Sequence, residues 1–197
     1  MKLFVDVDNT VFDSKNTVCK ILNKKYGKCV KGSEVKRYDF KDMFPELAKN
    51  EIRSIFNRHD FYEMSKVIPD AISTLSDFEI QKNYTINYVT LGSRTNSVYK
   101  HDALEKIKEL FGVDYCDMYW SDNSNKDKSF VDMTGGIMID DDIDCLRNCN
   151  ATVKILIKLD GDTEWNKINP CDDVYVVTSW KDVQDVLKFY IEQGKVI

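Results

Sequence analysis

The 197-residue sequence lacks several features that would mark a specialised class of protein. Its longest apolar runs are far too short to span a bilayer, so we expect no membrane association. We also expect no signal peptide, because Lys2 is followed at once by a short apolar run and two acids. Basic residues are not in excess: 28 Lys and Arg stand against 33 Asp and Glu, and the net charge is −5. This balance argues against a broad nucleic-acid or anionic-membrane interface.

Paired metal-binding cysteines are lacking as well. Cys145 and Cys149 have helical i, i+4 spacing, but no second Cys or His pair accompanies them to complete a zinc site. A chain of this length buries a sizeable core without disulfides. We therefore interpret the six cysteines as reduced thiols of a cytoplasmic protein.

What the sequence does contain is a series of β-rich runs that alternate with helical patterns. The expected strands span residues 3–5, 84–91, 115–120, 136–139, 153–159 and 174–177. Helices are expected before Gly27, after Pro45, from Pro69 with Phe78 on its inner side, from about Ser97 to Gly112, and over 180–193. Strands that alternate with helices predict a parallel sheet with right-handed crossovers.

Residues 14–67 show no strand pattern and predict a small all-helical module. It follows the first strand and ends where Pro69 opens the next helix. We therefore expect two parts, a core domain of residues 1–13 and 68–197 and a helical cap of residues 14–67.

Two acids, Asp6 and Asp8, stand where the first strand ends. Side chains at i and i+2 of an extended chain share a face, so these carboxylates point the same way. Crowding two like charges costs free energy unless a cation neutralises them or one carboxyl keeps its proton. The alternative is a capping turn, since Asp, Asn and Thr all favour turns.

The carboxyl ends of parallel strands meet at one edge of a sheet, which would gather further polar residues around Asp6. Thr90 ends the second strand, and Asp140, Asp141 and Asp142 follow the fourth. Several carboxylates with little base between them require a cation, and all-oxygen ligation favours Mg²⁺. A solvated turn at a helix N-terminus is the alternative for the last three acids.

These motifs, in this order, resemble those of the haloacid dehalogenase (HAD) superfamily of phosphohydrolases. Asp6-Val7-Asp8-Asn9-Thr10 matches a D-x-D-x-T motif, Thr90 matches a Thr or Ser that ends the next core strand, and Asp140-Asp141 matches a final acidic pair. The third motif, a lysine, matches Lys128, with Lys126 as the second candidate. The resemblance implies an α/β, Rossmann-like, three-layer fold around a parallel sheet, with a small helical cap.

The resemblance also implies roles for the matched residues. Asp6 would be the nucleophile that forms an aspartyl-phosphate, and Asp8 would protonate the leaving oxygen and then activate water. Thr90 would donate a hydrogen bond to a phosphoryl oxygen, and Lys128 would steady the nucleophile and the transferring charge. A carboxylate that attacks a phosphate dianion needs such cations to offset repulsion.

The same resemblance implies a Mg²⁺ cofactor. Its ligands would be Asp6, the backbone carbonyl of Asp8, and Asp140, with Asp141 one layer further out.

Within the superfamily, the sequence most resembles the 5′(3′)-deoxyribonucleotidases and their bacterial and phage relatives. The helical insertion, the aromatic segment at Phe61-Tyr62 and a tail segment at 177–183 carry this resemblance. It implies that Phe61 and Tyr62 stack on a nucleobase, and that Leu91, Gly92 and Arg94 also contact substrate. Ordinary helix packing for the two aromatics and a surface ion pair for Arg94 remain the alternatives.

We therefore predict a Mg²⁺-dependent nucleotidase that acts on a small (deoxy)nucleoside monophosphate. The enzymatic alternative is a phosphatase of nucleic-acid ends or of another small phosphate ester, although the acidic composition disfavours a nucleic-acid partner. A phospho-accepting receiver module is the alternative from another class, but such a module accepts phosphate on a later strand. Monomer and homodimer both remain open.

Overall fold

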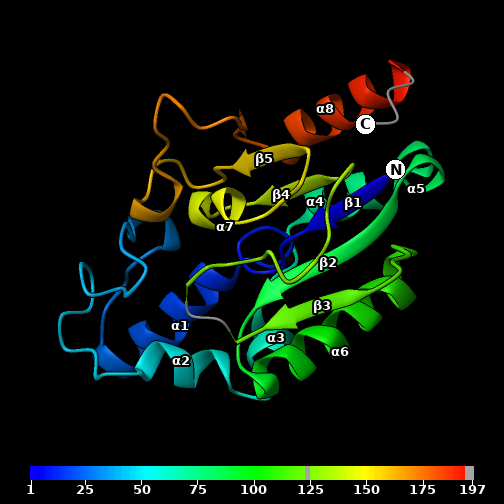
Figure 1. The fold of residues 1–197 in the computed structure, drawn as a ribbon. Coiled ribbons are helices and arrows are strands. Elements are labelled where there is room, and N and C mark those ends of the chain that lie inside the picture. The colour runs from blue at the N-terminus through cyan, green and yellow to red at the C-terminus, as the bar shows by residue number, and fades with distance from the viewer. Residues whose placement is uncertain (123–124, 194–197) are drawn as a thin grey trace.

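A computed structural model of the protein describes residues 1–122 and 125–193 (Figure 1). The strands are β1 (Lys2–Val5), β2 (Thr85–Leu91), β3 (Met118–Ser121), β4 (Ile137–Asp140), β5 (Val153–Ile157) and β6 (Tyr175–Val177). The α-helices are α1 (Ser14–Tyr26), α2 (Glu51–Phe56), α3 (Phe61–Met64), α4 (Pro69–Leu75), α5 (Phe78–Asn83), α6 (Arg94–Phe111), α7 (Ile143–Arg147) and α8 (Trp180–Glu192). Two 3₁₀ turns are η1 (Gly32–Glu34) and η2 (Glu164–Asn166). None of the helices in the described ranges is long and apolar enough to cross a membrane.

The six strands form one parallel sheet in the order β3-β2-β1-β4-β5-β6. The chain builds outward from β1 in both directions, so the strand order reverses between β1 and β4. Ligands of open α/β sheets bind at such a switch point, outside the carboxyl ends of the strands. Asp6 lies there, and its backbone N–H continues the pairing by donating to Ile139 O at 2.9 Å.

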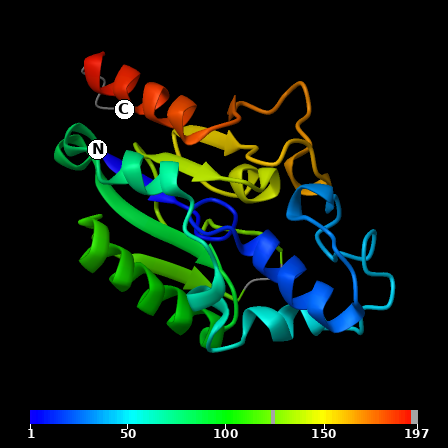
Figure 2. The same ribbon diagram turned by 180° about the vertical axis from the view of Figure 1, so that it is seen from behind.

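Successive side chains of β1 point to opposite faces of the sheet and pack into two separate hydrophobic clusters. Leu3 and Val5 join the cluster that includes residues of α4, α6 and α8. Phe4 faces the other way and joins the cluster that includes Ile143 and Leu146 of α7. Figures 1 and 2 show these helices on opposite faces of the sheet. The predicted three-layer α/β fold is confirmed.

The inserted segment, residues 14–67, contains α1, η1, α2 and α3 between β1 and α4, and no strand in the sheet. Helix α1 ends at Gly27, as predicted, because this residue adopts the left-handed conformation with φ +65°. The helix expected after Pro45 begins only at Glu51. Asn50 explains the delay, since its φ of +69° interrupts a right-handed helix.

Two further helix boundaries differ from the expectation because serine and aspartate caps intervene. Asp77 accepts hydrogen bonds from the backbone N–H groups of Glu79 and Ile80, and so starts α5 as a new helix. Phe78 therefore leaves the inner face and is 74% exposed. Ser93 caps α6 in the same way, which moves the helix start from Ser97 to Arg94.

Candidate active site

The strand ends bring three carboxyl groups together. Asp6 follows β1 and Asp140 ends β4, two adjacent strands, and Asp141 follows directly. One carboxylate oxygen of each of the three lies within 4.8 Å of the others. The sequence analysis placed Asp141 outside the metal ligands, whereas the structure makes it a member of the cluster.

Lys128 is fully buried against this cluster. Its Nζ donates to Asp6 Oδ1 at 2.6 Å, to Asp140 Oδ2 at 2.7 Å and to the Val89 carbonyl at 2.8 Å. Burial alone would lower the pKa of Lys128, but the two carboxylates raise it well above its usual range. Lys128 is therefore held as an ammonium beside Asp6.

Lys126, the other candidate for that motif, faces different partners. Its Nζ lies 2.7 Å from Asp142 Oδ2 and 5.2 Å from the centre of the Tyr38 ring. It lies at the cavity wall and makes its ion pairs with Asp142 and Asp144 rather than with Asp6.

The acids of the cluster fit a hard divalent cation. Burial raises the pKa values of Asp6, Asp140 and Asp141; Lys128 lowers those of Asp6 and Asp140 without cancelling the rise, and the neighbouring carboxylates raise all three further. Such a group of oxygen donors holds protons unless a cation offsets the repulsion. Asp140 already accepts hydrogen bonds on both oxygens, from Lys128 and from the Asp142 backbone N–H. Asp141 accepts on Oδ2 from Trp165 Nε1 at 2.9 Å, an orienting contact of the kind that supports metal ligands.

Asp8 is held by three side-chain donors from different elements. Ser14 Oγ and Tyr62 Oη donate to its Oδ1 at 2.5 and 2.9 Å, and Lys100 Nζ lies 2.7 Å from Oδ2. Burial and the Asp8 carboxylate raise the pKa of Tyr62 well above its usual range, so its hydroxyl stays protonated and donates. The predicted acid–base residue is thus fixed by both the core and the inserted segment.

Lys100 is a site residue that the sequence analysis missed. Its side chain is fully buried and donates to Thr90 Oγ1 and to the Leu91 carbonyl, in addition to its ion pair with Asp8. The available signal was its position: Lys100 lies four residues before Leu104 and seven before Ile107, on the apolar stripe of α6. A lysine on such a stripe needs a buried partner.

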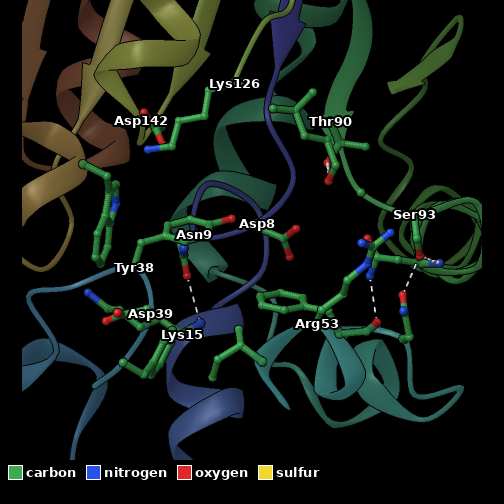
Figure 3. A pocket seen from close by; sticks show the side chains of 18 of the residues that line it. Asp8, Asn9, Lys15, Tyr38, Asp39, Arg53, Thr90, Ser93, Lys126 and Asp142 are labelled. Atoms are coloured by element: carbon green, nitrogen blue, oxygen red, sulfur yellow. Dashed lines mark hydrogen bonds and ion pairs between the residues drawn. The ribbon is translucent and has the colours of Figure 1, made fainter. Parts of the chain in front are cut away.

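A cavity of about 590 Å³ opens over these strand ends, a volume within the usual range for small-molecule sites. Figure 3 shows Asp8 and Thr90 facing the same space as Tyr38 and Arg53 of the inserted segment. The lining includes the predicted residues Asp6, Asp8, Thr90, Leu91, Gly92, Lys128 and Asp140, and also Lys15, Ile52, Phe56, Ser93, Asn96 and Trp165.

Three predicted substrate contacts do not lie in the cavity wall. Phe61 is fully buried and packs against Phe56, with ring centres 4.7 Å apart, so helix packing explains it. Tyr62 is also buried and reaches Asp8 instead of the cavity. Arg94 is exposed at the start of α6 and is not among the lining residues. The arginine that lines the cavity is Arg53.

The parallel sheet and its flanking helices form the fold of HAD-superfamily hydrolases of known structure. A model of one protein family, described as "5′ nucleotidase, deoxy (Pyrimidine), cytosolic type C protein", matches residues 1–192. The chain therefore belongs to this nucleotidase family and is a phosphoric monoester hydrolase.

Solved structures share the fold at low sequence identity. The HAD hydrolase YfnB from Bacillus subtilis, bound to magnesium, is 13% identical, with a TM-score of 0.59 over 94% of this chain and 97% of that one. The D,D-heptose 1,7-bisphosphate phosphatase from B. bronchiseptica, complexed with magnesium and phosphate, is 13% identical, with a TM-score of 0.56 over 96% and 99%. A phosphonoacetaldehyde hydrolase-like protein from Oleispira antarctica is 15% identical, with a TM-score of 0.57 over 98% and 94%. No curated protein matches the sequence significantly.

Proposed function

We propose that the protein is a Mg²⁺-dependent nucleotidase that removes phosphate from a deoxyribonucleoside monophosphate through an aspartyl-phosphate on Asp6. One observation carries the proposal: Asp6 lines the cavity at the switch point of the sheet, with the Lys128 ammonium 2.6 Å from its carboxylate. Family membership supplies the reaction class.

In the first step, Asp6 attacks phosphorus while the bond from phosphorus to the ester oxygen breaks. Asp8, which has to be protonated when substrate is bound, donates this proton to that oxygen, which leaves as the nucleoside hydroxyl. In the second step, water attacks the aspartyl-phosphate and gives a proton to Asp8. Inorganic phosphate leaves, the Asp6 carboxylate is restored, and Asp8 is again protonated.

Thr90 and Lys128 act on charge and position during both steps. Thr90 lines the cavity beside the nucleophile and would donate its hydroxyl hydrogen to a phosphoryl oxygen. Lys128 offsets the negative charge that accumulates when a carboxylate meets a phosphate dianion.

The residues that would hold Mg²⁺ are Asp6, the backbone carbonyl of Asp8 and one or both of Asp140 and Asp141. When bound, the ion would neutralise phosphoryl and carboxylate charge. Asp140 and Asp141 are both candidates for a direct carboxylate ligand, because the hydrogen bonds that they accept leave further acceptor positions on their oxygens.

The cavity supports a small substrate with one phosphate. Its volume of about 590 Å³ suits a mononucleotide, and its walls carry the aromatic side chains of Tyr38, Phe56 and Trp165. The family description names a deoxy, pyrimidine and cytosolic type of nucleotidase, which supports a deoxynucleotide substrate and a cytoplasmic location.

The test is phosphate release from all deoxy- and ribonucleoside monophosphates, with Mg²⁺ and with EDTA. We expect metal-dependent turnover, with a deoxynucleotide preferred. We expect mass spectrometry of acid-quenched wild-type enzyme to detect a phosphoryl adduct, and Asp6→Asn to abolish both turnover and this adduct. Asp102→Asn, an exposed aspartate of α6, is the matched control. Residual activity of Asp6→Asn above about one per cent would contradict the nucleophile assignment, since losing a nucleophile costs far more than a hundredfold.

A further inference from the structure

Lys100 is a fully buried cation at the site, and the proposed mechanism gives it no role. Its side chain is 0% exposed, and it is not among the residues that line the cavity. It therefore does not reach a substrate in this arrangement, but it contacts two residues that do line the cavity, Asp8 and Thr90.

The contact with Thr90 determines which way the threonine hydroxyl points. Lys100 Nζ lies 2.5 Å from Thr90 Oγ1, and a lysine ammonium only donates hydrogen bonds. Thr90 Oγ1 must therefore accept, so its own hydrogen points elsewhere. The Leu91 carbonyl, an acceptor for the Thr90 hydrogen, is 3.5 Å from Oγ1 and already accepts from Lys100 at 2.8 Å.

The same Lys100 ammonium also holds Asp8. Lys100 holds Asp8 Oδ2 at 2.7 Å, while Ser14 and Tyr62 of the inserted segment hold Oδ1. One helical turn before Lys100, Asn96 donates to Tyr62 Oη at 3.2 Å. Helix α6 thus fixes Asp8 both directly and through Tyr62.

We propose that Lys100 is a positioning residue. It orients the Thr90 hydroxyl to donate a hydrogen bond to phosphate, and it sets the distance between Thr90 and Asp8. This inference rests on the proposed function, in which Thr90 binds a phosphoryl oxygen. Because Thr90 Oγ1 accepts from Lys100 and the Leu91 carbonyl is a distant acceptor at 3.5 Å, the Thr90 hydrogen can turn towards a phosphoryl oxygen in the cavity that Thr90 lines. Preorganised donors of this kind need no rearrangement when charge arrives.

The experiment is a double-mutant cycle read as the inhibition constant of inorganic phosphate against nucleotide hydrolysis. The variants are Lys100→Met, Thr90→Val and the double variant, with Lys106→Met as the control on an exposed part of α6. Methionine keeps the buried stem and removes the ammonium, and valine replaces only the hydroxyl. Competitive inhibition measures phosphate binding separately from proton transfer by Asp8.

We expect each single variant to raise the inhibition constant about tenfold, the effect of one hydrogen bond to a charged group. The double variant should stay within about threefold of Thr90→Val, because Lys100 acts through Thr90. Lys106→Met should match wild type within about twofold, as surface charges on this scale usually do. Thr90→Ser, which restores a hydroxyl, should recover most of the affinity.

Losses that multiply to about a hundredfold would show that Lys100 acts on phosphate independently of Thr90, and would overturn the inference. So would a Lys100→Met variant that binds phosphate as wild type does. If Lys100→Met does not fold, the cycle is repeated in an Asp8→Asn background, in which the loss of Lys100 leaves no unpaired carboxylate. The readout is then the inhibition of residual turnover or a direct titration with phosphate. Wild-type enzyme that hydrolyses no monoester refutes the proposed function itself. Normal hydrolysis together with losses that multiply in the double variant refutes only this inference.

Discussion

Lys128 Nζ lies 2.6 Å from Asp6 Oδ1, a contact that joins residues 122 positions apart in the chain. The same ammonium reaches Asp140 at 2.7 Å. Removing it would leave two buried carboxylates without their cation and the attacking carboxylate without charge support. We expect Lys128→Met to lower kcat by a factor of about 10² to 10³.

Lys126→Met is the matched control for that variant, because Lys126 lies two residues away and pairs with Asp142. Steady-state kinetics of both variants with the preferred nucleotide checks the assignment. A larger kcat loss in Lys126→Met than in Lys128→Met would exchange the roles of the two lysines.

The strand-end residues could be predicted from the sequence because a local pattern fixes them. Buried strands followed by acids or threonine place Asp6, Thr90 and Asp140 at one sheet edge whatever the rest of the chain does. The sequence favoured Lys128 over Lys126 by resemblance, and the contacts of the two side chains could not be predicted, since residues 125–128 lie in no helix or strand.

The inserted segment was harder to predict because its side chains are placed by packing between elements. Phe61 and Tyr62 are adjacent aromatics in one short helix, yet one packs against Phe56 and the other donates to Asp8. No periodicity distinguishes these outcomes. Lys100 was missed for a related reason: its partners lie on β2 and in the loop after β1, and only the fold brings them to α6.

Asp141 provides a test of the metal site. Removal of metal with EDTA should abolish turnover, and added Mg²⁺ should restore it. Asp141→Asn replaces one carboxylate of the cluster with a neutral amide, so we expect the Mg²⁺ concentration for half-maximal activity to rise about tenfold or more. Titration of activity with Mg²⁺ measures this change.

Asp144→Asn is the control for Asp141→Asn, since Asp144 is a nearby aspartate that pairs with Arg147 outside the cluster. Its Mg²⁺ requirement should equal that of wild type. An equal Mg²⁺ requirement in wild type, Asp141→Asn and Asp144→Asn would mean that Asp141 does not ligate the ion.

Arg53 and Arg94 differ in their relation to the cavity, and this difference predicts their effects on substrate binding. Arg53 extends from α2 into the cavity (Figure 3). Arg94 lies exposed at the start of α6 and does not line the cavity. We expect Arg53→Ala to raise KM about tenfold, the scale of one lost charged hydrogen bond, and Arg94→Ala to leave KM unchanged. Steady-state kinetics with the preferred nucleotide measures the KM of both variants. A larger rise of KM in Arg94→Ala than in Arg53→Ala would restore Arg94 as the substrate contact inferred from the sequence.

The ion pair between Arg147 and Asp172 predicts a pH dependence of stability. Arg147 Nε and Nη2 donate to the two Asp172 oxygens at 2.9 and 2.6 Å, and this hydrogen bonding lowers the pKa of Asp172 from 3.8 to about 2. A carboxyl whose pKa is lower in the folded state stabilises the fold above its unfolded pKa. That contribution is lost as the pH falls from about 4 towards 2.

Asp172→Asn should therefore lower the free energy of unfolding by about 1 kcal/mol at pH 7, because the pair is partly exposed and screened. Urea unfolding at a series of pH values should show the difference from wild type shrinking below about pH 4, with most of it lost by about pH 2. Asp162→Asn removes an ion-paired carboxylate that is 91% exposed, and should leave the unfolding curve unchanged. A difference between wild type and Asp172→Asn that is as large at pH 2 as at pH 7 would show that the charge of Asp172 is not its source, since at pH 2 this carboxyl is protonated in the unfolded state and about half protonated in the folded state.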